Sequence, residues 1–337
     1  GGMVMNFAYL VIAVFGVAQG AHAQGVPQGD RNAPQFTPAW PTQTRAPEQN
    51  SGVQMQFEVL AEGLDTPWGM VELPEGGILV TERSGTLRLV QGGMAGAPIA
   101  GVPQVLAQRQ GGLLDVALAE DFATSHAIYL TYAKPIGEGM SATAAARAVL
   151  SVDGKALTDV REVFVQDPPS PNAMHFGARV VPQGGYLYIT TGEHFSTRER
   201  QFAQDVNKTY GKVVRVLPEG GVAAGNPFGN EVWSLGHRNV QGAALRADGT
   251  LWTLEHGPAG GDELNLITRG ANYGWPVVSY GVNYSGVAVG SGMARAEGFT
   301  EPQYYWDPVI APGGFAFYCG DMFTGWQGDV LAASLNP

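Results

Sequence analysis

The segment Pro74–Arg83 reads PEGGILVTER, a Gly-Gly turn that leads into a short strand of apolar and β-branched residues. The pattern recurs at Pro182–Thr191 (PQGGYLYITT) and at Ala247–His256 (ADGTLWTLEH). A second strand-like stretch follows each copy, at Thr86–Val90, Lys212–Val216 and Glu263–Ile267. Turn residues between short β-rich runs are typical of β-hairpins. The repeat therefore predicts an all-β domain built from hairpin units.

The spacing of these units indicates how they are arranged. They recur roughly every 50 to 80 residues, which is the scale of four-stranded propeller blades with insertions. Ala127–Tyr132 and Asp329–Ala333 extend the series to about five units within residues 54–337, a region without extended helical periodicity. We expect Phe57–Ala61 to be a strand that closes a ring. A β-propeller is favoured over a β-sandwich, with loops from several blades meeting around a central channel.

The amino-terminal 53 residues differ in composition from the rest. Phe7–Ala18 is apolar and Ala21-His22-Ala23 is a small-x-small cleavage pattern, so residues 1–23 are predicted to be a signal peptide, although no Lys or Arg precedes the run. The run is short for a bilayer span. Residues 24–53 carry five prolines among polar residues, which predicts a linker. We expect a periplasmic or secreted protein without stable membrane insertion after cleavage.

Composition restricts the classes of partner and of site. The chain has 337 residues, of which 45% are hydrophobic and 15% charged, so a substantial core is expected. The formal net charge of −11 argues against nucleic acid, because phosphate binding requires clustered Lys and Arg. Cys319 is the only cysteine, which excludes an intrachain disulfide and a cysteine-based metal site.

Four histidines are candidates for a general base, because imidazole titrates near neutral pH. His175 stands in a loop before a predicted strand, in the sequence Met174-His175-Phe176-Gly177. Its rivals are His194, His237 and His256, and composition does not rank them. A structural histidine is the alternative for each.

Further candidates are residues suited to an anion or to a hard cation. Arg238 and Asn239 pair a guanidinium with a carboxamide, which suits carboxylate and quinone oxygens. Gly257-Pro258 can present two successive carbonyl oxygens, and Glu263 can add a carboxylate; calcium accepts both kinds of ligand. No EF-hand loop, His-Glu-x-x-His motif, phosphate loop or Gly-x-Ser-x-Gly elbow is present.

Several motifs in this order resemble the soluble quinoprotein sugar dehydrogenases, the glucose/sorbosone dehydrogenase family, and within it the aldose sugar dehydrogenases. The likeness runs from about Phe57 to the end of the chain. The motifs are Gln110–Leu114 (QGGLL), His175–Gly177 (HFG), Gly236–Gly242 (GHRNVQG), Gly257-Pro258 with Asp262–Asn265 (DELN), and Asn272–Pro276 (NYGWP). The resemblance implies a six-bladed β-propeller that holds pyrroloquinoline quinone (PQQ) and calcium at the channel mouth.

The resemblance also implies roles for individual residues. His175 matches the catalytic base, and Arg238 would stabilise the oxyanion that develops on the quinone. The residues implied to contact the quinone are Gln110, Arg238 and Asn239, and more weakly Ala311, Pro312 and Gly313. Gly257 and Pro258 match carbonyl ligands of the calcium under the cofactor. Glu263 and Tyr273 match ligands of a second, structural calcium, the tyrosine through its backbone oxygen.

The implied function is oxidation of an aldose at its anomeric carbon to a lactone, with hydride passing to the quinone and onward to an unknown electron acceptor. Family members continue for most of another blade beyond Ser334–Pro337, so we expect an incomplete last blade and a weakened cofactor site. The alternatives are a calcium-dependent propeller lactonase or hydrolase and a non-catalytic binding propeller.

Overall fold

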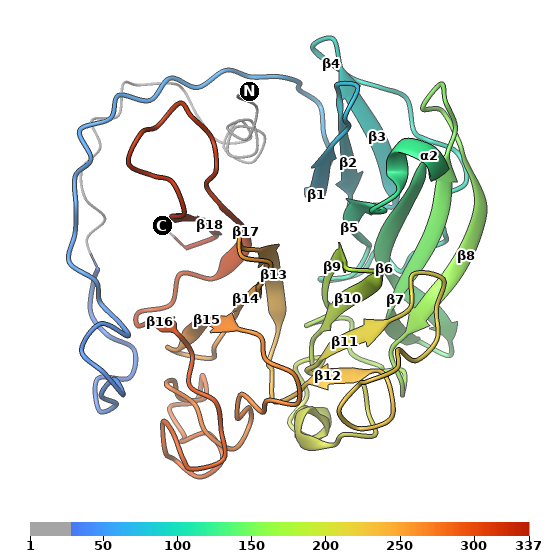
Figure 1. Ribbon diagram of the computed structural model, residues 1–337. Helices are drawn as coiled ribbons and strands as arrows, with labels where there is room; N and C mark the ends of the chain where they lie inside the picture. The colour runs from blue at the N-terminus through green and yellow to red at the C-terminus, as the bar shows by residue number, and fades with distance from the viewer. Residues whose placement is uncertain (1–27, 337) are drawn as a thin grey trace.

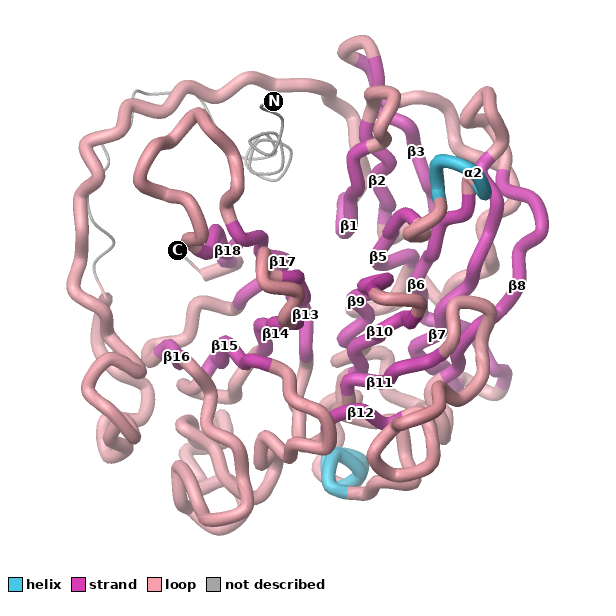
Figure 2. Tube along the Cα trace, viewed as in Figure 1, coloured by secondary structure: helices cyan, strands magenta, loops and turns pink. Residues whose placement is uncertain are grey.

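The computed structural model describes residues 28–336, and the predicted signal peptide lies outside them. This part of the chain forms five antiparallel sheets (Figures 1 and 2). Four have four strands: β1 to β4 (Pro67–Glu72, Ile78–Glu82, Thr86–Gln91, Met94–Ala95), β5 to β8 (Leu113–Leu118, Ala127–Gly137, Met140–Leu150, Leu157–Val165), β9 to β12 (Gly177–Gln183, Tyr186–Thr191, Val213–Val216, Val232–Ser234) and β13 to β16 (Val240–Leu245, Leu251–Glu255, Asp262–Leu266, Tyr304–Trp306). The fifth has two, β17 (Pro312–Phe317) and β18 (Val330–Ser334).

The repeated hairpins form the middle of three sheets. The three copies of the turn-and-strand pattern contain β2, β10 and β14, and each pairs antiparallel with the next strand along the chain. Two short helices accompany the strands in residues 28–336, α2 (Phe122–Ser125) and the 3₁₀ helix η1 (Glu199–Gln204). Neither they nor any other described helix is long and apolar enough to cross a membrane. The all-β prediction is confirmed.

The sheets follow one another as blades do in a propeller. The first strands of successive sheets, β1, β5, β9, β13 and β17, contact one another in that order (Figure 1). Alternate residues of β6 face opposite ways: Ile128 and Leu130 pack in the core shared with the first sheet, and Tyr129 packs in the core shared with the third. This is the two-residue period of a strand buried on both faces.

The number of blades differs from the expectation. Residues 28–336 contain four four-stranded sheets and one two-stranded sheet, not the six blades that the family resemblance implied. The count of about five hairpin units agrees better, because each unit contributes a strand pair to one sheet.

The predicted strand at Phe57–Ala61 is also wrong, since these residues do not form a strand. Leu60 and Ala61 instead pack against Val80 and Val90 of the first sheet. Their apolar character is explained by this packing, which does not require a ladder of backbone hydrogen bonds.

The described part of the Pro-rich segment is packed on the domain along the outer strand β16. Thr44 forms a parallel bridge with Tyr305, and the Tyr305 N–H donates to the Gln43 carbonyl at 2.9 Å. The Gln43 side chain is buried and donates to Glu301 at 2.9 Å. The buried Asp307 carboxylate accepts from the backbone N–H of Asn32 at 2.5 Å. Polar side chains and backbone groups thus anchor a segment that has little apolar surface of its own.

Candidate functional site

The candidate residues come together because of hairpin geometry. In an antiparallel hairpin the start of the first strand and the end of the second lie at the same edge. Gly177 pairs with Thr191 at that edge of the third sheet, and Val240 pairs with Glu255 in the fourth. The loops before β9 and β13 and those after β10 and β14 therefore meet there, bringing His175, Glu193, Arg238 and Gly257 together.

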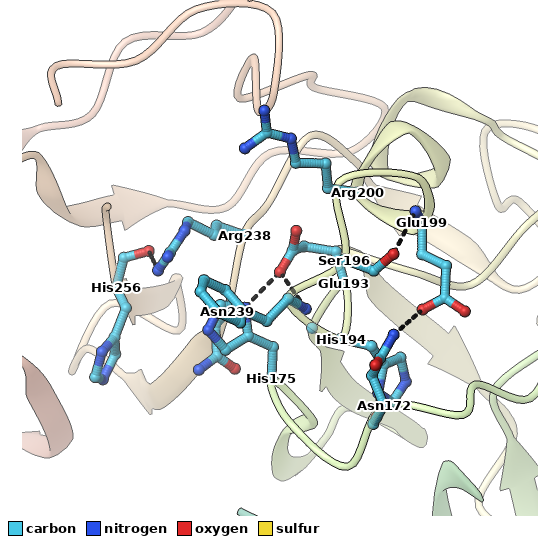
Figure 3. Close-up of polar contacts among 12 residues, drawn as sticks. Asn172, His175, Glu193, His194, Ser196, Glu199, Arg200, Arg238, Asn239 and His256 are labelled. Carbon is cyan, nitrogen blue, oxygen red and sulfur yellow. Dashed lines mark hydrogen bonds and ion pairs between the residues drawn. The ribbon is translucent and has the colours of Figure 1, made fainter. Parts of the chain in front are cut away.

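A cavity of about 410 Å³ lies beside these loops. It is lined by acidic, basic and aromatic side chains from segments 193–200 and 283–287, and by Arg238, Pro258 and Trp275. Figure 3 shows four of the lining residues, Glu193, Ser196, Arg200 and Arg238, with nearby polar side chains. Both charge signs and several aromatic faces are present, which suits a polar ligand with ring atoms.

His175 forms a dyad with Glu193. Its Nδ1 contacts Glu193 Oε1, and both side chains are buried. The close approach of the two loops depends on Gly192, because a Cβ there would lie 1.8 Å from the His175 carbonyl oxygen. Glu193 is held by the Phe195 N–H at 3.0 Å and, more distantly, by Trp275 Nε1 at 3.4 Å. A carboxylate on Nδ1 leaves Nε2 as the basic nitrogen.

Burial and hydrogen bonding act on this dyad in opposite directions. Burial lowers the pKa of His175, while the hydrogen bond that its Nδ1 donates to Glu193 raises it. Burial raises the pKa of Glu193, but the contact with His175 and the charge of Arg238 outweigh it, so this pKa is lowered. At neutral pH the dyad therefore holds an ionised glutamate and a neutral imidazole that can accept a proton.

The rival histidines are engaged elsewhere. In His194, Nε2 is hydrogen-bonded to Gln166 Oε1 at 2.5 Å and Nδ1 to the Asn172 carbonyl at 3.0 Å. In His237 both ring nitrogens are hydrogen-bonded as well, Nδ1 to Glu255 at 2.8 Å and Nε2 to Ser234 at 2.9 Å. His256 contacts the carbonyl of Pro312 at 2.6 Å, and burial lowers its pKa to about 4. Of the four, His175 combines a carboxylate partner with a ring nitrogen that has no partner among the described residues.

Arg238 is a buried cation inside an aromatic enclosure. Its guanidinium donates to the Gly257 carbonyl at 2.8 Å and to the Tyr284 hydroxyl at 3.3 Å. The guanidinium carbon lies 5.3 Å from the centroid of the Trp275 ring and 5.9 Å from that of Phe195. No ion pair joins Arg238 to a carboxylate among residues 28–336. Its positive charge is therefore available to an anionic ligand.

Two carboxamides predicted to contact a quinone lie next to His175. Gln110 Oε1 accepts from the His175 N–H at 2.8 Å. Asn239 Oδ1 accepts from the Gly177 N–H at 3.0 Å. Each side chain thus uses its oxygen to hold the histidine loop, which leaves the amide N–H groups as the donors for a ligand.

The turn after β14 is stabilised by a buried acid. Asp262 accepts from the backbone N–H of Gly257 at 2.7 Å and from those of Ile310 and Ala311 at 2.8 and 2.9 Å. Burial raises the pKa of Asp262 to about 6, although these three donors oppose the shift. Ala311–Gly313 therefore lies against the 257–262 turn and His256, and not among the residues that line the cavity.

Glu263 and Tyr273 belong to a separate cluster. Asn265 Nδ2 donates to Glu255 at 3.0 Å and to Glu263 at 3.2 Å, while the buried Asn265 Oδ1 has no partner. Burial and the charge of Glu255 raise the pKa of Glu263 well above its usual range. Tyr273 stacks on His237 with ring centroids 4.7 Å apart. Two crowded carboxylates and an unused amide oxygen are a donor set that suits a hard cation.

One wall of the cavity depends on a buried lysine. The Lys212 ammonium donates to the carbonyls of Phe202, Ala203 and Tyr210 at 2.8, 3.1 and 2.7 Å. Phe202 and Ala203 belong to η1, and Tyr210 belongs to the loop that follows it. The first turn of η1 lines the cavity through Arg200. Lys212 therefore holds this loop in place.

The chain matches a known enzyme family. Residues 64–337 match the family model for glucose/sorbosone dehydrogenase. This chain belongs to the glucose/sorbosone dehydrogenase family. It is 43% identical to the aldose sugar dehydrogenase YliI of Escherichia coli over 293 residues, which are 84% of this chain and 78% of that protein. The resemblance drawn from the motifs is confirmed.

Solved structures of family members have the same fold. The soluble aldose sugar dehydrogenase from Escherichia coli in its apo form superposes with a TM-score of 0.79 at 43% identity, covering 82% of each chain. The PQQ-bound aldose sugar dehydrogenase from Streptomyces coelicolor gives 0.66 at 30% identity, covering 82% of this chain and 83% of that one.

Two residues of this family member's site were missed from the sequence. Glu193 follows the hairpin strand β10 and precedes His194, just as Glu255 ends β14 and precedes His256. This repeated Glu-His pair was the available signal. Arg200 lines the cavity from η1, and no local pattern singles it out.

Proposed function

We propose that this protein is a PQQ- and calcium-dependent dehydrogenase that oxidises aldose sugars at the anomeric carbon to lactones. The observation that carries the proposal is the buried His175–Glu193 dyad beside a cavity that also holds the unpaired Arg238. Family membership and a PQQ-bound neighbour support the cofactor. The predicted leader supports export to the periplasm.

The residues of the cavity fit an anionic quinone. Arg238 provides charge from the cavity wall, and Gln110 and Asn239, which hold the His175 loop through their amide oxygens, have amide N–H groups to offer, so these three residues would hold the cofactor. Gly257 and Pro258 would offer carbonyl oxygens to calcium. The Gly257 carbonyl already accepts from Arg238, so a cation there would lie near a guanidinium. An anionic ligand between the two would offset that repulsion.

Proton removal is the task of the dyad. His175 Nε2 takes the proton of the anomeric hydroxyl, and the Glu193 carboxylate stabilises the imidazolium that forms. Arg238 stabilises negative charge that develops in the cavity. When bound, PQQ supplies the hydride acceptor and calcium supplies Lewis acidity.

The test is reduction of an artificial dye by an aldose, with and without added PQQ and calcium. We expect turnover only with both, and a lactone product. His175→Ala should lower turnover by about 10²-fold or more while PQQ still binds. Lactone hydrolysis without quinone would identify a lactonase instead, and PQQ or sugar binding without turnover would identify a binding propeller.

A further inference from the structure

Arg200 is a second cation on the cavity wall. Its guanidinium carbon lies 5.5 Å from the centroid of the Trp275 ring, the ring that Arg238 also faces at 5.3 Å. One terminal nitrogen donates to Asn283 at 2.8 Å, and the buried Nε has no partner. Since arginine has five N–H donors, most of its donor capacity is left for a ligand.

Within residues 28–336 this guanidinium has no carboxylate counter-ion. The adjacent carboxylate, Glu199, accepts instead from Ser170 at 2.7 Å and from Asn172 at 3.4 Å. The carboxylate of Glu193 is held by His175 and by the Phe195 N–H. Among residues 28–336 no acid forms an ion pair with Arg200. An arginine is always charged, so a half-buried, unpaired one favours an anion beside it.

Arg200 and Arg238 share the Trp275 ring and the 283–287 wall, where Arg238 donates to the Tyr284 hydroxyl at 3.3 Å, but they differ in their other contacts. Arg238 is tied to the Gly257 carbonyl, at the end where the cofactor is proposed to bind. Arg200 is tied to Asn283 of the 283–287 wall, and Figure 3 shows it on the side of Arg238 and Glu193 away from His175. A ligand held by Arg238 alone would leave the Arg200 charge uncompensated.

We propose that Arg200 binds a carboxylate of the ligand in this cavity, a role that rests on the proposed function. A guanidinium matches a carboxylate with two parallel hydrogen bonds. The carboxylate has two chemical sources: an acidic sugar such as a uronic acid, or the quinone itself. In the first case the enzyme prefers uronic acids to the neutral aldoses of the same configuration.

The test compares Arg200→Gln with Arg198→Gln. Arg198 is exposed, lies two residues away at the start of η1 and does not line the cavity, so both variants lose one positive charge from the same segment. One arm measures KM for glucose and glucuronate, and for galactose and galacturonate. The other arm titrates PQQ into the calcium-loaded protein and follows binding by fluorescence, without turnover. Thermal melts establish that each variant is folded. A third variant, Arg200→Lys, retains the positive charge but lacks the planar guanidinium that makes two parallel hydrogen bonds.

For an acidic sugar, Arg200→Gln should raise KM for the uronic acids by about tenfold or more and leave the neutral sugars unchanged. For a quinone carboxylate, the Kd for PQQ should rise by a similar factor with sugar selectivity unchanged. Arg200→Lys should give a smaller effect in the same arm. If folded Arg200→Gln matches Arg198→Gln in both arms, the inference is wrong. If no sugar is oxidised by the parent protein, the proposed function fails, whereas the PQQ titration still reports on Arg200.

Discussion

Replacing Glu193 by glutamine tests the dyad with the smallest change in shape. Glu193 Oε1 faces both His175 Nδ1 and the Phe195 N–H, while Oε2 faces only Trp275 Nε1 at 3.4 Å. A glutamine will therefore place its carbonyl oxygen at the Oε1 position, where two donors need an acceptor. Its NH₂ group then faces the more distant indole. The imidazole keeps its orientation and its tautomer, and only the negative charge is lost.

The expected loss follows from that geometry. A hydrogen bond to a charged group contributes about 1.5–3 kcal/mol and a neutral one about 0.5–1.5 kcal/mol, so the charge accounts for about 1.5 kcal/mol. We expect kcat/KM of Glu193→Gln to fall by about tenfold. Glu193→Ala, which also removes the acceptor, should lose about 100-fold.

The pH profile gives an independent readout. Burial already lowers the pKa of His175, and the Glu193 hydrogen bond counteracts it. The imidazole must be neutral to act as a base, so kcat/KM should decline as the pH falls through its pKa, below the usual 6.5. Without the carboxylate this pKa drops further, and the acidic limb of the profile should move to lower pH.

The assay is dye reduction at saturating PQQ and calcium, with kcat/KM measured across the pH range in which the parent is stable. PQQ binding serves as the control and should be unchanged. A folded Glu193→Gln variant with the parent's kcat/KM and an unmoved acidic limb would refute the dyad. A change in PQQ affinity would place Glu193 in the cofactor site instead.

Three further predictions concern stability. Calcium at 100-fold its Kd should stabilise the protein by about 2.7 kcal/mol. Because burial and the charge of Glu255 disfavour the ionised form of Glu263, Glu263→Gln should be more stable than the parent without calcium and should lose the calcium response. An equal response in both proteins would exclude this cluster as the calcium site. Lys212→Met should lower the free energy of unfolding by about 3 kcal/mol, because three carbonyls lose their hydrogen-bond donor. An unchanged midpoint of denaturant unfolding would show that Lys212 does not hold the loop that follows η1. Gln43→Ala should lower the melting temperature, because it removes the buried hydrogen bonds of the Gln43 amide to Glu301 and to the Pro302 carbonyl. No change would mean that the amino-terminal segment contributes little to stability.

The hairpins were predictable because they are local. A Gly-rich turn followed by β-branched and aromatic residues specifies a strand pair within about 20 residues of chain, and β2, β10 and β14 appear where the pattern placed them. The strand at Phe57–Ala61 was mispredicted for the complementary reason. An apolar stretch does not by itself specify a strand: Ala61 is buried and Leu60 partly buried by packing on the first sheet, whereas Phe57 and Val59 are exposed.

The candidate residues were identifiable by type, and their partners were not. Residue chemistry singled out four histidines, an arginine and a Gly-Pro turn, and the repeated hairpins indicated that their loops share one edge. The choice of His175 over His194 depends on which ring nitrogens remain unused, and that follows from contacts with Gln166 and Asn172 made across separate loops.

Local sequence was sufficient to predict the repeated hairpins and to identify the candidate residue types, because these depend on backbone propensity and on residue type. The dyad of His175 and Glu193, 18 residues apart, and the unpaired state of Arg200 required the folded chain. Hydrogen bonds and charge compensation depend on which side chains meet after the sheets pack, and no period in the sequence encodes that.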